Sequence, residues 1–167
     1  MNWHGEAVWE AVAPLAPGFT VEVLAEVDST NTELMRRARA GRIEPVLLVA
    51  ERQTQGRGRL GRGWTSAPGD SLTFSLRLQL APADWAGLSL AVGVAVAEQL
   101  HPRVRLKWPN DLWVDDRKLA GILIETATAT ATVAAAAAPR YAVIGVGINV
   151  RAPRGDVRTA VLMLLTE

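Results

Sequence analysis

The sequence contains no cysteine, which excludes disulfides, thiolate zinc sites, iron–sulfur clusters and cysteine nucleophiles. Its two histidines, His4 and His101, are too few for a histidine-based metal cluster. No apolar run reaches the roughly 18 residues that span a bilayer, and the N-terminus lacks the basic-then-apolar layout of a secretory signal. We therefore expect a soluble, cytoplasmic protein without a membrane partner.

A large net charge is also missing. The 167 residues carry a formal charge of +1, and 49% of them are apolar and 21% charged. This is an ordinary composition for one globular domain with a real core, and it argues against a basic nucleic-acid coat protein. Lysine is scarce as well, because only Lys107 and Lys118 are lysines among 18 basic residues.

Hydrophobic periodicity predicts an α+β fold. Alternating or short apolar segments predict strands, at 19–27, 45–51, 71–80, 104–108 and 141–150, and a hairpin over 112–126 that turns at Asp115-Asp116. Helices are predicted at 5–13, at 30–40, at 84–100 and at 156–165. The helix at 30–40 would begin with Thr30 as its cap, and the apolar helix at 84–100 would lie at the centre of the core. The late hairpins favour a mixed, largely antiparallel sheet backed by helices over a regular βαβ winding, and the low-complexity segment 127–138 is interpreted as a connection.

A loop rich in glycine and arginine, from Arg52 to Pro68, is the most distinctive segment. It has arginines at 52, 57, 59 and 62 and no acidic residue between Glu51 and Asp70. Its glycines let the backbone approach a ligand, its amides can form an anion nest, and arginine makes bidentate contacts with phosphate or carboxylate. Trp64 could stack on a planar base. A flexible RNA-binding loop is the alternative interpretation.

The second motif is Lys107-Trp108-Pro109-Asn110-Asp111, which Lys118 follows seven residues later. Lysine is a compact, mobile charge that can follow a developing negative charge. Asp111 could hold a magnesium ion together with substrate phosphates. A purely structural turn explains the Pro-Asn-Asp sequence equally well at this point.

Two shorter motifs complete the candidate site. The polar segment 28–31 joins a predicted strand to a predicted helix and would suit a small polar head group, although a helix cap alone explains Thr30. In the segment 145–149, Gly145 and Gly147 could mark the close approach of a ligand or simple strand packing.

Taken in order, these motifs resemble the catalytic domain of biotin protein ligases (biotin–[acetyl-CoA-carboxylase] ligases). The matching segments are DSTN at 28–31, AERQTQGRGRLGRGW at 50–64, KWPNDLWVDDRKLAGILIE at 107–125 and GVGIN at 145–149. The resemblance implies a fold similar to class II aminoacyl-tRNA synthetases and shared with the related lipoate ligases. It also implies two steps: biotin and ATP form biotinyl-5′-AMP, and a lysine of a biotin carboxyl carrier protein, from acetyl-CoA carboxylase or a related carboxylase, then takes the biotin.

The resemblance also implies a role for individual residues. The catalytic residues would be Lys118, Arg57 and Arg59. Biotin would contact Ser29, Thr30, Asn31, Gln53, Arg57, Gly58, Arg59, Lys118 and Gly121. ATP or the adenylate would contact Trp64, Lys107, Asn110 and Asn149, and Asp111 would lie near Mg²⁺. The arginine loop would close over the adenylate and exclude water that hydrolyses it.

The resemblance sets the expected domain organisation too. Residues 1–150 would form the catalytic domain, and 151–167 would be a short tail in place of the small SH3-like domain of bacterial relatives. The 27 residues before Asp28 leave no room for a DNA-binding helix-turn-helix, so no DNA partner is expected. Two alternatives stay open: a truncated protein that binds biotin or its adenylate without full ligase turnover, and a lipoate-type ligase. The GRGR loop together with KWPND favours biotin.

Overall fold

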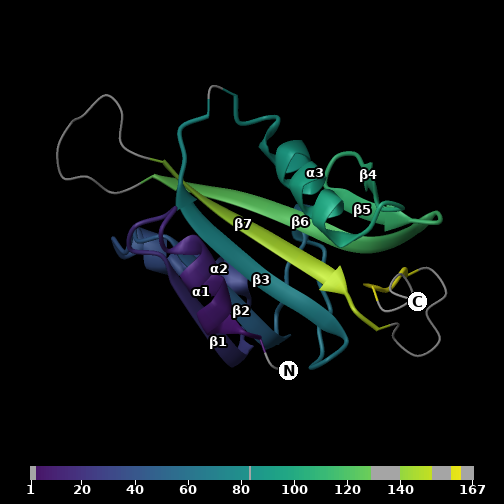
Figure 1. Cartoon of the computed structure of the whole chain (residues 1–167), viewed down its shortest axis with the longest axis horizontal. Helices are drawn as coiled ribbons and strands as arrows, with labels where there is room; N and C mark the ends of the chain where they lie inside the picture. The colour runs from purple at the N-terminus through teal and green to yellow at the C-terminus, as the bar shows by residue number, and fades with distance from the viewer. Residues whose placement is uncertain (1–2, 83, 129–139, 152–158, 163–167) are drawn as a thin grey trace.

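The fold is one mixed sheet with helices on its faces (Figure 1). The structure is a computed structural model, which describes residues 3–82, 84–128, 140–151 and 159–162. Within these residues the strand order is β1-β2-β3-β7-β6-β5-β4. The strands are β1 (Thr20–Val27), β2 (Val46–Gln53), β3 (Ser71–Gln79), β4 (Arg105–Lys107), β5 (Asp111–Val114), β6 (Arg117–Thr128) and β7 (Arg140–Asn149). The helices are α1 (Gly5–Val12), α2 (Thr30–Arg39), α3 (Leu88–Leu100) and the short 3₁₀ helix η1 (Arg59–Gly61).

The pairing of the strands confirms the predicted α+β class. Strands β1 and β2 run parallel because α2 returns the chain between them, and the other described pairs are antiparallel. The hairpin between β5 and β6 turns where predicted, with φ of 49° at Asp115 and 59° at Asp116. Both positive values belong to the tight two-residue turns that match the twist of a hairpin.

The two faces of the sheet are covered by different helices. Helix α2 packs against one face through Leu34 and Met35, which join Val46, Leu48 and Val143 in a buried cluster. Helix α3 covers the opposite face beside β4, β5 and β6 (Figure 1). None of the described helices is long and apolar enough to cross a membrane.

Three predictions about helices need correction. The apolar helix begins at Leu88 rather than 84 and does not lie at the centre of the core, because only Gly93 on it is buried and Val94 is 46% exposed. Its leucines and valines on one side are partly buried against the sheet, and the opposite side lies in solvent. The cap of α2 is Ser29, whose hydroxyl accepts from the Thr32 amide at 3.4 Å, so Thr30 is free for other bonds.

The last correction concerns the end of the chain. Within the predicted helix 156–165, Thr159 instead forms a parallel bridge with Lys118, and the Ala160 amide donates to the Lys118 carbonyl at 2.9 Å. The other residues of that prediction, apart from 159–162, lie outside the described residues. Of the predicted connection 127–138, residues 127–128 belong to β6 and the remainder also lies outside them.

Candidate active site

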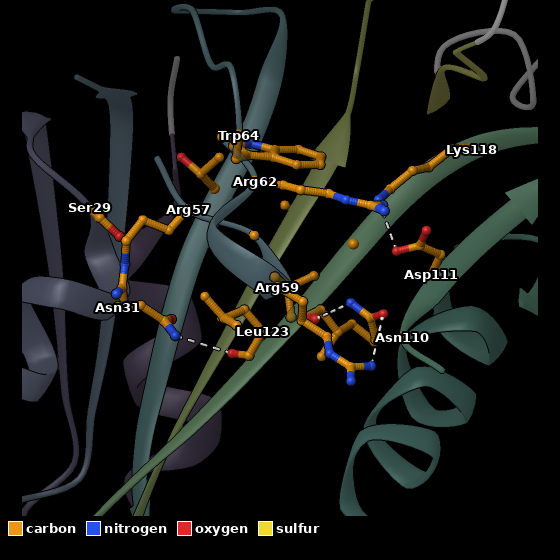
Figure 2. Close-up of a pocket in the computed structure, with 18 of the residues that line it drawn as sticks. Ser29, Asn31, Arg57, Arg59, Arg62, Trp64, Asn110, Asp111, Lys118 and Leu123 are labelled. Atoms are coloured by element: carbon orange, nitrogen blue, oxygen red, sulfur yellow. Dashed lines mark hydrogen bonds and ion pairs between the residues drawn. The ribbon is translucent and has the colours of Figure 1, made fainter. Parts of the chain in front are cut away.

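A cavity of about 580 Å³ opens on the sheet face that carries α2, beyond the beginning of that helix (Figure 2). The predicted site residues line it, with one exception. That exception is Asn149, which lies at the end of β7 and donates its side-chain amide to the Lys118 carbonyl at 3.3 Å. The structure therefore brings together residues that are up to 118 positions apart in the chain, from Ser29 to Gly147.

Two glycines make the sheet hollow at this point. A Cβ atom on Gly145 would lie 2.2 Å from Asn31 Oδ1, and one on Gly147 would lie 2.5 Å from the Trp64 ring. Real Cβ atoms do not approach other atoms this closely. The side chains of Asn31 and Trp64 can therefore lie directly on the backbone of β7 only because positions 145 and 147 are glycine. The segment 145–149 therefore forms the floor of the cavity.

One end of the cavity is polar and carries no net charge, because an ion pair with Glu125 offsets the charge of Arg57 there. The Thr30 amide donates to Gln53 Oε1 at 2.7 Å, and Ser75 Oγ lies 2.7 Å from Thr30 Oγ1 and 2.6 Å from Asn31 Oδ1. A serine hydroxyl has one hydrogen and the Asn31 oxygen only accepts, so Ser75 donates to Asn31. The single hydroxyl hydrogen of Thr30 then faces two acceptors, Ser75 Oγ and Gln53 Oε1, the latter at 3.1 Å. Buried polar groups bonded in this way hold fixed orientations.

The other end is rich in positive charge. Lys118 Nζ lies 2.8 Å from Asp111 Oδ1, and Lys107 Nζ lies 3.3 Å from the centre of the Trp113 ring. Arg62 runs below the Trp64 ring towards Lys118 (Figure 2). Asp111 is the single carboxylate among the residues that line the cavity. This end therefore carries an excess of cations and suits a ligand with several negative charges.

The arginine loop roofs the cavity and is closed at its base by backbone bonds. The Trp64 amide donates to the Gly56 carbonyl at 2.8 Å, and the Gly58 amide donates to the Arg62 carbonyl at 2.7 Å. Arg57 and Gly63 form an antiparallel bridge between these two bonds. The loop therefore has a defined backbone fold, and this fold places its arginines in the lining of the cavity.

Comparison with known proteins agrees with this arrangement of motifs. The model of the biotin/lipoate A/B protein ligase family matches residues 23–149. The chain belongs to this family. The segments that line the cavity all lie within the matched range.

Individual relatives are named as biotin ligases. The biotin--[acetyl-CoA-carboxylase] ligase of Mycobacterium tuberculosis is 38% identical over 141 residues, which cover 78% of this chain and 49% of that protein. The bifunctional ligase/repressor BirA of Escherichia coli is 44% identical over 144 residues, covering 82% and 42%. The biotin protein ligase from Aquifex aeolicus in complex with biotin and ATP is similar in structure, with a TM-score of 0.68, 31% identity and coverage of 88% and 61%. This chain spans about half the length of the curated relatives it matches.

The sequence motifs missed several residues of this family member's site. Ser75 lies on β3 outside every motif. Glu125 lies within the segment 107–125, but the resemblance assigns it no role. Both residues form a hydrogen bond with Asn31. Arg62 and Trp113 also line the cavity without having been assigned to it. A signal for Ser75 was present, because Ser71, Thr73, Ser75 and Arg77 repeat a polar residue at every second position of an otherwise apolar strand. That alternation indicates a polar face, and the structure buries it.

The described residues contain no cluster of three His, Cys, Asp or Glu side chains that could hold a metal ion. A magnesium ion that travels with a nucleotide usually takes only one or two protein carboxylates, with phosphates and water completing its shell. Asp111 meets that requirement, since its carboxylate is at the cationic end of the cavity and one quarter of its side chain is exposed.

Proposed function

We propose that this chain is the catalytic unit of a biotin protein ligase, which activates biotin with ATP and transfers it to a lysine of a carrier protein. The observation that carries this proposal is the division of one cavity into a polar end without net charge and a cationic end. Biotin has a neutral ureido ring at one end and a carboxylate at the other, so its two ends match the two ends of the cavity. We place this activity in residues 1–150, which contain the family match.

In the first step, a biotin carboxylate oxygen attacks the α-phosphorus of ATP. The bond from that phosphorus to the bridging oxygen breaks, and pyrophosphate leaves with its electron pair. Both reactants are anionic, so the site has to align them and offset their repulsion. Lys118 would move from Asp111 to the carboxylate and the α-phosphate, with Arg57 and Arg59 beside it. No protein nucleophile is needed.

The remaining residues would bind the two substrates. Ser29, Thr30, Asn31 and Gln53 would bind the ureido ring, with Gly58 and Gly121 alongside biotin. Trp64, Lys107, Asn110 and Asn149 would contact the nucleotide. Asp111 would hold Mg²⁺, which would screen the phosphate charges when bound.

In the second step, the amine of a carrier lysine attacks the acyl carbon of biotinyl-5′-AMP. An amide bond forms, the acyl–phosphate bond breaks, AMP leaves, and the amine loses a proton. The partner would be a biotin carboxyl carrier protein of acetyl-CoA carboxylase or a related carboxylase. The arginine loop over the cavity supports this step, because a mixed anhydride survives only where water is kept out.

A lipoate-type ligase is the nearest alternative activity. The dithiolane ring of lipoate has no group that hydrogen-bonds as a urea does. The dithiolane would place an apolar group against the polar side chains of Thr30 and Asn31, which line this end of the cavity, and would offer no hydrogen bond in place of the water it displaces. The polar end of the cavity therefore favours biotin over lipoate.

The test is ATP–pyrophosphate exchange on this chain, with biotin and lipoate as parallel acids and biotin titration calorimetry on the same sample. Exchange with biotin alone is the expected result. Exchange with lipoate alone would support the alternative activity. Binding of biotin without exchange would make the chain a biotin-binding protein without ligase turnover, and neither binding nor exchange would overturn the proposal.

A further inference from the structure

Glu125, on β6, touches both the roof and the polar end of the cavity without lining it. Its Oε2 atom accepts a hydrogen bond from Asn31 Nδ2 at 3.0 Å and forms an ion pair with Arg57. Strand register explains its position, because Glu125 pairs with Val143 and therefore points to the same face as Gly145 and Asn31. One carboxylate oxygen thus joins two segments that are remote in the chain.

The bond to Asn31 fixes the direction of that amide. Asn31 Nδ2 also donates to the Leu123 carbonyl at 3.1 Å (Figure 2), while its Oδ1 accepts from Ser75. With both amide hydrogens held by β6 and the oxygen held by β3, the side chain has one orientation. Glu125 supplies one of those two acceptors.

The ion pair between Glu125 and Arg57 connects the arginine loop to the sheet. Among the described residues, it is the one ion pair that involves residues 55–64. The other side-chain contact across the cavity, from Arg59 to Asn110, is longer at 3.4 Å and lacks a negative partner. Glu125 also offsets the charge of Arg57, so the end of the cavity next to Asn31 stays neutral while the Lys118 end remains cationic.

We propose that Glu125 is a positioning residue for biotin recognition, which holds Arg57 and the arginine loop against the polar end of the cavity and orients Asn31. This inference rests on the proposed function for its ligand, but its contact between loop and sheet is independent of any reaction. Glu125 acts through Arg57 and Asn31 and makes no contact with the reacting atoms.

The first test compares Glu125→Gln with Glu26→Gln. Both replacements neutralise a carboxylate paired with an arginine, but the Glu26–Arg52 pair, at 2.8 Å, is about half exposed and lies outside the cavity lining. Partly exposed ion pairs contribute little to stability, so both variants should melt within a few degrees of the unchanged protein. Glu125→Gln should raise the KM for biotin in pyrophosphate exchange roughly three- to tenfold, a loss comparable to one ordinary hydrogen bond, with kcat within about twofold. Glu26→Gln should change neither.

The second test does not depend on the reaction. Trypsin cuts after arginine, and the loop offers Arg57, Arg59 and Arg62. Cleavage of a native loop reports how often it opens. Cleavage at these sites should be roughly three- to tenfold faster in Glu125→Gln than in Glu26→Gln, a difference comparable to one ordinary hydrogen bond.

A double variant separates positioning from general damage. In an Arg57→Gln background, adding Glu125→Gln should raise the KM for biotin by at most about twofold further, because the partner is already lost. Unchanged KM and unchanged cleavage in Glu125→Gln would overturn the inference. So would equal cleavage in both single variants. If the unchanged protein neither binds biotin nor catalyses biotin-dependent pyrophosphate exchange, the proposed function fails. The cleavage rates still decide whether Glu125 holds the loop.

Discussion

Lys118 Nζ lies 2.8 Å from Asp111 Oδ1 at the cationic end of the cavity, and the lysine side chain remains 39% exposed. Under the proposed function, this ion pair holds the Lys118 ammonium group near the place where phosphate charge would develop, without burying it. The pairing also offsets one of the positive charges at this end of the cavity before an anion enters it. Under the proposed function, Lys118 would exchange a protein carboxylate for a substrate carboxylate and phosphate.

Replacing Lys118 by alanine should separate catalysis from binding. We expect the rate of biotinyl-adenylate formation to fall by about a hundredfold or more, because a charge aimed at the transition state is lost. Affinity for biotin, measured by calorimetry, should change by less than about threefold because the polar end of the cavity is untouched. Equal losses in both quantities would make Lys118 a ligand of the ground state and not a catalytic residue.

Arg59→Gly should affect retention of the intermediate more than its formation. Arg59 lies in the roof of the cavity, and its contact with Asn110 spans the opening at 3.4 Å. Pyrophosphate exchange should stay within about threefold of the unchanged protein, while free biotinyl-5′-AMP accumulates in the filtrate because the roof is weaker. Release at the unchanged rate would contradict this role for Arg59.

The two glycines of β7 should control different substrates. A methyl group from Gly145→Ala would displace Asn31, so affinity for biotin should fall roughly tenfold or more through the loss of its hydrogen bonds. A methyl group from Gly147→Ala would instead displace the Trp64 ring and should raise the KM for ATP.

Each of these glycine variants serves as the control for the other. Both add one methyl group to the same strand, two residues apart, so a general loss of stability should affect them alike. Calorimetry with biotin and steady-state kinetics with varied ATP would distinguish them. The same loss for both ligands in both variants would contradict the division of the cavity.

Arg77→Met should not destabilise the protein. Arg77 is 2% exposed, and its Nη1 has no hydrogen-bond partner among the described residues. Burial is the largest influence on this group and lowers the pKa of the Arg77 guanidinium, against the attraction of Glu44. Removing a buried, incompletely bonded charge and keeping its aliphatic volume should leave the free energy of unfolding unchanged or raise it by about 1 kcal/mol. Chemical denaturation measures this, and a fall of more than about 2 kcal/mol would show that the bonds to the Glu44 carbonyl outweigh desolvation.

The local elements were largely predictable because their signals are local. Alternation placed β1, β3 and β7 within a few residues of their observed bounds, and Asp115-Asp116 marked the hairpin turn correctly. Helix α3 was misjudged because an apolar run of small residues does not say how much of it is covered. The cap of α2 is Ser29 and not the predicted Thr30. Thr30 instead forms hydrogen bonds with Gln53 and Ser75, which lie on other strands.

The chemical groups of the site can be identified without the structure: they are the scarce lysines, the arginine loop, the polar residues before α2 and the glycines of β7. Those motifs are contiguous, so their chemistry can be read along the chain. The contributions of Ser75 and Glu125 become visible in the folded protein alone, because these residues are 44 and 94 positions away from Asn31 in the chain. The physical reason is strand register, which sets the face to which each side chain points and so selects the residues that meet across the cavity.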